Sequence, residues 1–129
     1  MSPWTAFPHA DDYAFTAVSL KKHWAKLHAG DREPLPKSAK ALTAWMHFHN
    51  GQFQKAAETG LKAGATGVTV ANKATCIYAV YLEPKEKTRL SLLMEVADRA
   101  AAQAMEHPEN PNAFYWQGYA LGRYSQGIS

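Results

Sequence analysis

Hydrophobic positions recur at helical spacing along most of the chain, and short runs rich in Gly, Pro and Asn interrupt them. One interruption falls at Asn50-Gly51. Apolar or small residues follow it at i, i+3, i+4, i+7 and i+8, the spacing of one helix face: Phe53, Ala56, Ala57, Gly60 and Leu61. A similar run precedes it: Leu42, Trp45, Met46 and Phe48. This pattern predicts two helices that lie antiparallel across a tight turn.

The same spacing predicts six helices and an all-α fold class, with the whole chain, 1–129, as a single domain. The first helix is expected at 9–29, with one apolar stripe and with acidic residues in its first turn. That stripe consists of Tyr13, Ala17, Leu20, Trp24 and Leu27. The later helices are expected at about 36–50, 52–63, 68–82, 84–107 and 111–125. Pro84 and Pro111 suit first helical positions, and Asn110 suits an N-cap.

The turn at Gly51, followed by Phe53 and Ala56, resembles the turn inside a tetratricopeptide (TPR) repeat. Further positions match small or large residues of that repeat: Ala44, Ala63, Phe114, Gly118 and Leu121. Others depart from it: Lys40, Thr43, His47, Gly60 and Val68. The resemblance implies antiparallel helical hairpins stacked as a TPR-like superhelix. Residues 37–64 would form repeat 1, 68–107 repeat 2, and 111–125 the first helix of an incomplete repeat 3.

A narrower pattern lies in Ala113-Phe114-Tyr115-Trp116 and in Ala120-Leu121-Gly122-Arg123-Tyr124. It resembles the TPR-like T component of tripartite (TRAP-type) transporters, which is periplasmic and lipid-anchored. The first residues here, Met1-Ser2-Pro3-Trp4, lack the charged and apolar regions of a signal peptide. We therefore carry over the fold from this resemblance, and we expect a cytoplasmic protein.

The predicted last helix has apolar or aromatic residues nearly all round. They are Phe114, Tyr115, Trp116, Tyr119, Leu121 and Tyr124. A helix of this kind is normally covered on every side, and repeat arrays normally end in a unit with a polar outer face. Two hypotheses follow. Either the chain is part of a longer repeat protein, or it self-associates through residues 111–125.

Composition and charge exclude several classes of function. The chain has 129 residues, of which 47% are hydrophobic, and a net charge of +3 spread along its length. A nucleic-acid-binding surface would require a clustered basic stripe, so none is expected. No run of about 18 apolar residues occurs, so membrane insertion is not expected either. Cys76 is the single cysteine, which excludes a disulfide framework.

The residues that carry chemistry form no recognisable constellation. Six histidines occur, but His47 and His49 are about 200° apart on a helix. No pair has the spacing of a metal site. Neither a nucleophile elbow nor a phosphate-binding loop is present. We therefore predict no catalytic residues, no metal and no cofactor.

These observations favour a non-catalytic module that binds a protein or peptide partner in a groove made by the first helix of each pair. The candidate partner-binding residues are His47, Tyr78, Tyr81, Trp116, Tyr119 and Tyr124. The alternative is a small-molecule-binding or transport-accessory protein, with a pocket between helices lined by Trp45, Tyr78 and Trp116.

Overall fold

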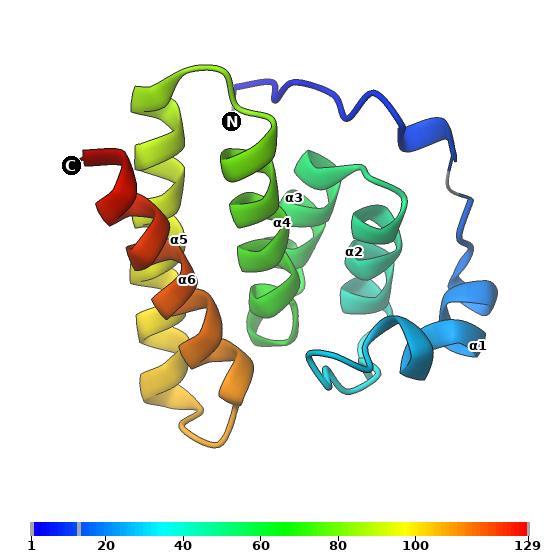
Figure 1. The fold of residues 1–129 in the computed structure, drawn as a ribbon. Coiled ribbons are helices and arrows are strands. Elements are labelled where there is room, and N and C mark those ends of the chain that lie inside the picture. The colour runs from blue at the N-terminus through cyan, green and yellow to red at the C-terminus, as the bar shows by residue number, and fades with distance from the viewer. Residues whose placement is uncertain (1, 13, 129) are drawn as a thin grey trace.

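The computed structural model describes residues 2–12 and 14–128, and in this part of the chain every regular element is helical. The α-helices are α1 (Ala17–Leu27), α2 (Ala39–His49), α3 (Phe53–Lys62), α4 (Val68–Tyr81), α5 (Glu86–Glu106) and α6 (Pro111–Ile128). Two short 3₁₀ turns, η1 (Ala10–Asp12) and η2 (Gly64–Gly67), accompany them. From α2 onward each helix packs on the next, and α4 also contacts α2 and α6. Figure 1 shows this row, with α6 crossing α5 and the N-terminal segment running along one edge. The predicted all-α fold is confirmed.

The first helix begins later than predicted. It starts at Ala17, not at residue 9, because Thr16 forms a capping box with Ser19. Just before it, the side chain of Asn50 holds the backbone of Phe15 through both its N–H and its carbonyl oxygen, at 2.8 and 3.0 Å. Of the predicted stripe, Leu20 and Trp24 are buried, Ala17 and Leu27 are exposed, and Tyr13 lies outside the described residues.

The turn between α2 and α3 is the tight connection that the sequence predicts. Gly51 adopts a left-handed conformation with φ of 74°. The N–H of Gly51 donates to the carbonyl of Phe48, and the N–H of Gln52 donates to that of His47. This pair of hydrogen bonds is the Schellman motif that ends many helices, and it favours glycine at the left-handed position.

The close approach of α3 and α4 depends on two further glycines. A Cβ atom at Gly60 would lie 2.7 Å from the carbonyl oxygen of Gly67, and one at Gly67 would lie 2.7 Å from the carbonyl carbon of Gly60. Side chains at either position would therefore force the two backbones apart. Val68 begins α4, so the segment 68–70 is helical as predicted.

The last two helices differ from the prediction at their ends. Pro84 precedes α5 by two residues and is not its first residue, because Lys85 is the N-cap and is extended. Pro111 does begin α6, and the side chain of Asn110 accepts from the N–H of Asn112, as expected of a cap. The helix continues to Ile128, beyond the predicted end at 125.

The core has two centres on opposite sides of α4. One joins α1, α2, α3 and the start of α4, and its buried residues include Leu20, Trp24, Trp45 and Val70. The other joins the end of α4 with α5 and α6 and is built mostly of small residues: Cys76, Ala79, Leu93, Val96, Ala97, Ala100, Trp116 and Ala120. Helix α4 contributes to both centres, which explains why most of its residues are buried.

Candidate functional site

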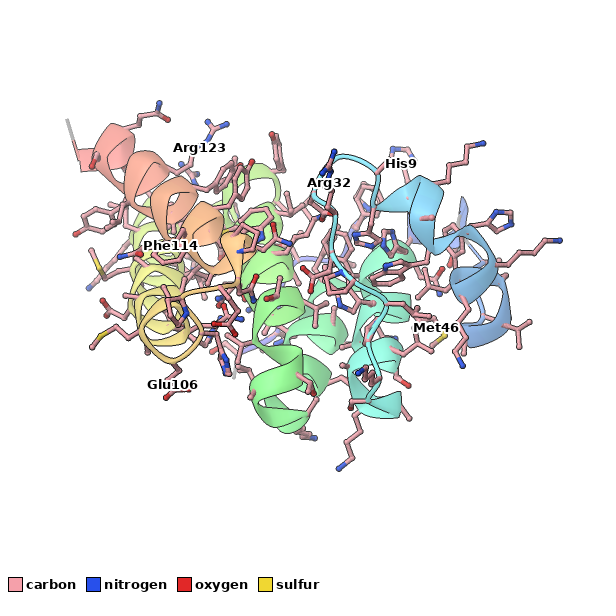
Figure 2. All side chains as sticks on the ribbon, turned by 90° about the horizontal axis from the view of Figure 1, so that it is seen from below. His9, Arg32, Met46, Glu106, Phe114 and Arg123 are labelled. Carbon is pink, nitrogen blue, oxygen red and sulfur yellow. The ribbon has the colours of Figure 1, made fainter. Side chains whose placement is uncertain are left out.

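A half-open hollow of about 590 Å³ lies where the loop after α1 meets α4 and the start of α6. Its lining combines backbone, charged and aromatic groups: Gly30, Asp31, Arg32, Lys73, Pro111, Asn112, Tyr115 and Trp116. Figure 2 shows Arg32 on that loop, with Phe114 and Arg123 on α6. The hollow thus joins segments that are far apart in the sequence.

Lys73 of α4 lines this hollow. Its ammonium group lies 5.1 Å from the ring centre of Phe48, 5.6 Å from that of Trp45 and 6.0 Å from that of Trp116. These distances allow a cation–π attraction to each ring. The same ammonium group is 3.1 Å from Oδ2 of Asp31. Lys73 therefore links the two centres of the core and fixes the loop after α1.

The buried His28 and the half-buried His49 form a chain of contacts with Asp31. Nδ1 of His28 lies 3.0 Å from Oδ1 of Asp31, and its Nε2 lies 2.9 Å from Nε2 of His49. Because a carboxylate only accepts, His28 donates from Nδ1 and accepts at Nε2 from His49. Burial lowers the pKa of His28 despite Asp31, and burial with His28 and Lys73 nearby lowers the pKa of His49 to about 4. Both imidazoles are therefore neutral at pH 7.

The acidic residues of the loop have different environments. Burial alone would raise the pKa of Asp31, but the N–H of Glu33, Lys73 and His28 together lower it. Burial raises the pKa of Glu33, whose carboxylate accepts from the side-chain amide of Asn112. The same amide also donates to the carbonyl of Asp31. Asn112 thereby ties the start of α6 to the loop.

Arg32 lies at the rim of the hollow, and its side chain is exposed. Its φ of 54° is in the left-handed region, which is rare for a residue other than glycine. The N–H of Arg32 donates to the carbonyl of His28, which closes the turn that holds this conformation. Within residues 2–12 and 14–128, no hydrogen bond or ion pair holds its guanidinium group. A strained, exposed arginine beside a hollow is a feature typical of binding sites.

A row of aromatic side chains on α6 continues from the hollow, and we call Tyr115, Trp116 and Tyr119 the aromatic shelf. Tyr115 and Trp116 meet edge to face at 4.9 Å, and Tyr119 lies 5.2 Å from Trp116. The guanidinium group of Arg123 lies over the ring of Tyr119 at 5.4 Å. Partial burial raises the pKa of Tyr119, which is also influenced by Tyr81 of α4. The hollow and this shelf form one face shared by α4 and α6.

The candidate residues from the sequence divide into two groups. Trp116 and Tyr119 lie on this face, and Tyr81, 66% exposed, stands beside Tyr119. The other three lie elsewhere. His47 bonds Gln52 beside the α2–α3 turn. Tyr124 lines a depression against α5.

Tyr78 is the third residue that lies elsewhere, and it is not exposed on the face shared by α4 and α6. It is 1% exposed because Trp4 stacks on it. The predicted pocket between Trp45, Tyr78 and Trp116 is not formed either. Tyr78 and Trp116 line different cavities, and Trp45 is buried in the first core centre. The side chain of Lys73 fills the space between Trp45 and Trp116.

The sequence did not reveal the polar part of the hollow. Lys73 lies 42 positions after Asp31 and Asn112 lies 81 positions after it, and no local motif connects the three. Asp31 and Arg32 lie in a Gly- and Pro-containing segment that reads as an ordinary loop. The sequence signal nearest to this site is the position of the loop between α1 and α2, two helices that carry several aromatic residues.

Metal binding and thiol chemistry are two further functions that side chains of this kind can serve. Among the described residues, no three His, Cys, Asp or Glu side chains come together in a way that could hold a metal ion. Cys76 is fully buried, and burial raises the pKa of its thiol to about 12. It is therefore protonated at pH 7 and unreactive as a nucleophile. Within the described residues, the hollow presents the exposed side chain of Arg32 beside the aromatic rings of Tyr115 and Trp116.

Comparison of the chain with protein-family models, with curated proteins and with solved structures finds no match. None of the helices within the described residues has the length and apolar character needed to cross a membrane.

Proposed function

We propose that this protein is a non-catalytic interaction module, built of TPR-like helical hairpins, that binds a peptide segment of a partner protein on the face shared by α4 and α6. The observation that carries the proposal is the hollow of about 590 Å³ with Arg32 at its rim and Tyr115 and Trp116 in its wall. Tyr115 is 57% exposed. Exposed aromatic and arginine side chains around a concavity are the residue types that dominate binding energy at protein interfaces.

The chemistry of the hollow indicates which part of a peptide it would hold. Lys73 is already neutralised by Asp31, so the free charge is that of Arg32. An acidic or carbonyl group of the ligand would pair with Arg32 while an apolar side chain packs on Tyr115. The adjoining shelf at Tyr119 and Tyr81 extends the contact surface.

The proposal is tested by selecting binders from a displayed library of random twelve-residue peptides against the full chain. The enriched peptides are then measured by fluorescence polarisation on Tyr115→Ala, on Arg32→Ala and on Phe114→Ala. Phe114 is the matched control, because it is an exposed aromatic residue of the same helix that does not line the hollow.

We expect the first two variants to weaken binding at least ten-fold and the control to leave it within two-fold. Failure to enrich any peptide, or equal binding by the Tyr115 and Phe114 variants, would overturn the proposal.

A further inference from the structure

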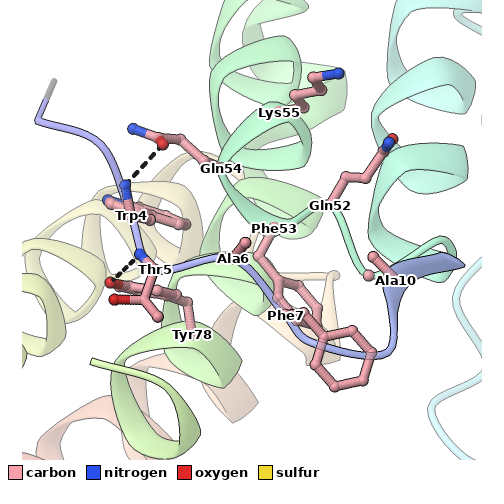
Figure 3. Close-up of a pocket in the computed structure, with 11 residues that line it drawn as sticks. Trp4, Thr5, Ala6, Phe7, Ala10, Gln52, Phe53, Gln54, Lys55 and Tyr78 are labelled. Carbon is pink, nitrogen blue, oxygen red and sulfur yellow. Dashed lines mark hydrogen bonds between the residues drawn. The ribbon is translucent and has the colours of Figure 1, made fainter. Parts of the chain in front are cut away.

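A second surface, distant in sequence from the hollow, already holds an extended peptide, which is the chain's own N-terminal segment. Residues 2–7 have no regular structure and cross the start of α3 and the end of α4 (Figure 3). Residues 4–7 of this segment line, with Gly51, Phe53 and Tyr78, a cavity of about 330 Å³. Prolines at positions 3 and 8 favour this extended conformation.

The segment is held mainly through its backbone. The side-chain amide of Gln54 accepts from the N–H of Trp4 at 2.9 Å and donates to the carbonyl of Ser2 at 2.8 Å. The hydroxyl of Tyr78 accepts from the N–H of Thr5 at 3.0 Å. Such contacts do not depend on the side chains of the bound segment, and protein surfaces that recognise extended peptides obtain affinity in the same way.

Two aromatic side chains of the segment give it its register. The ring of Trp4 stacks on Tyr78 with centroids 4.3 Å apart and an angle of 12°. The ring of Phe7 lies 5.8 Å from that of Phe53 and packs on Gly51, where a Cβ atom would overlap it. Because Gly51 has no side chain, it can adopt the left-handed conformation of the turn and leaves room for the ring of Phe7.

Of residues 2–7, Trp4 is the one that packs against a core centre. Thr5, Ala6 and Pro8 are exposed, and Trp4 and Phe7 are only half-buried. The separate anchor of Phe15 on Asn50 keeps α1 in place without these contacts. Release of residues 2–7 therefore leaves the helices packed and exposes Tyr78, Gln54 and Phe53.

We propose that this groove is a second binding site, for an extended peptide with two aromatic residues spaced i and i+3, and that residues 2–7 occupy it in cis and so compete with the ligand. It is independent of the hollow at Arg32. A partner peptide binds by the same backbone contacts to Gln54 and Tyr78 and places its aromatic rings where Trp4 and Phe7 now lie.

The test uses a fluorescently labelled peptide of residues 2–10, Ser-Pro-Trp-Thr-Ala-Phe-Pro-His-Ala, and the full chain with Trp4→Ala and Phe7→Ala. These substitutions empty both aromatic seats. We expect the double variant to bind the peptide at least ten-fold more tightly than the unaltered chain does. The same peptide with both aromatic residues replaced by alanine should bind at least ten-fold more weakly.

Two further substitutions in the double variant define the site. Gln54→Ala is expected to weaken binding about five-fold or more, and Gln117→Ala, on α6, is the matched control and should change nothing. Equal binding by the unaltered chain and the double variant, or no loss on removing Gln54, would overturn the proposal.

A measurement on the unaltered chain decides the matter if the double variant does not fold. Excess unlabelled peptide should displace the cis segment, and the amide resonances of Trp4 and Thr5 should move to the positions of an unstructured chain. Resonances that stay unchanged at millimolar peptide would overturn the proposal.

Discussion

The described aromatic residues of the first half of the molecule are buried or half-buried, whereas several of those on α6 are exposed. Trp24 and Trp45 are 6% and 1% exposed, and Phe53 is half-buried beneath Phe7. On α6, Phe114 is 50% and Tyr115 57% exposed. Both regions are rich in aromatic side chains, so composition does not account for the difference.

The difference lies in what packs on each region. The described residues before α1 lie against α2, α3 and the end of α4, where Asn50, Gln54 and Tyr78 bond the backbone of Phe15, Trp4 and Thr5, and α1 packs on α2. Among the described elements, helix α6 packs mainly on α5 and α4, and Asn112 near its start bonds the loop after α1. Gly118 and Gly122 of α6 face open space, because a Cβ atom added at either position would have no neighbour from another part of the described structure within 4 Å. Among these helices, exposed aromatic groups therefore concentrate on α6, with Tyr81 at the end of α4 beside them, and they support the proposed role of this face in binding.

The largest expected effect is the loss of a covered aromatic residue. Trp45→Ala should lower the free energy of unfolding by about 3 to 5 kcal/mol, because it leaves a cavity in the first core centre. Phe114→Ala should change it by about 0.5 kcal/mol or less, as expected of a surface site. Urea unfolding followed by circular dichroism measures both. Similar losses for the two variants would show that α6 is covered in solution.

Next in size is the effect of a side chain at the α3–α4 contact. Gly67→Ala should destabilise the protein by about 2 to 3 kcal/mol, because the new methyl group meets the backbone of Gly60. The measurement is again the midpoint of urea unfolding. An unchanged midpoint would mean that the two helices separate at little cost.

The pH dependence tests the buried polar groups of the first half. The pKa of His49 falls from 6.5 in the unfolded chain to about 4 in the fold, so the unfolded state binds more protons between these values. Stability is complete above pH 6.5 and is lost as the pH falls toward 4, by about 1 to 2 kcal/mol at pH 5 after allowance for screening. His28 acts in the same sense, and the raised pKa of Glu33 opposes it.

The matched variants are His49→Gln and His23→Gln, since His23 is exposed on α1. The loss of stability between pH 7 and pH 5, from thermal unfolding, should shrink in the first and persist in the second. A slope that survives in His49→Gln would assign the effect to other groups.

The smallest expected effect is a gain on α6. Gly118→Ala should stabilise the protein by about 0.5 to 1 kcal/mol, because alanine favours helix and the position has free space. Thermal unfolding at two protein concentrations measures it. A loss of stability that depends on concentration would indicate that a second copy packs on this helix.

Much of the fold was predictable because its signals are local. The helices from α2 to α6 follow apolar spacing, and their ends follow Gly51, Asn110 and Pro111. The start of α1 follows a local capping box of Thr16 and Ser19, which the predicted start at residue 9 overlooked. The bonds of Asn50 to Phe15 join residues 35 positions apart, so this second constraint cannot be read from the helix's own sequence.

The candidate site was predictable only in its aromatic half. Trp116, Tyr119 and Tyr81 lie on the proposed binding face, whereas Tyr78 lies away from it and is covered. The burial of Tyr78 depends on Trp4, 74 positions earlier in the chain. A helical pattern specifies which residues share a face, but it does not specify what lies against that face.

The sequence by itself thus determined that the chain forms six helices, how most of them are bounded and that successive ones pack side by side, because spacing and caps act within a few residues. Tertiary structure alone decided that Lys73, Asp31 and Asn112 meet in one hollow, that the buried His28 and the half-buried His49 become a neutral pair and that residues 2–7 occupy a groove. These outcomes depend on desolvation and on contacts between distant segments, and such effects exist only once the helices have assembled.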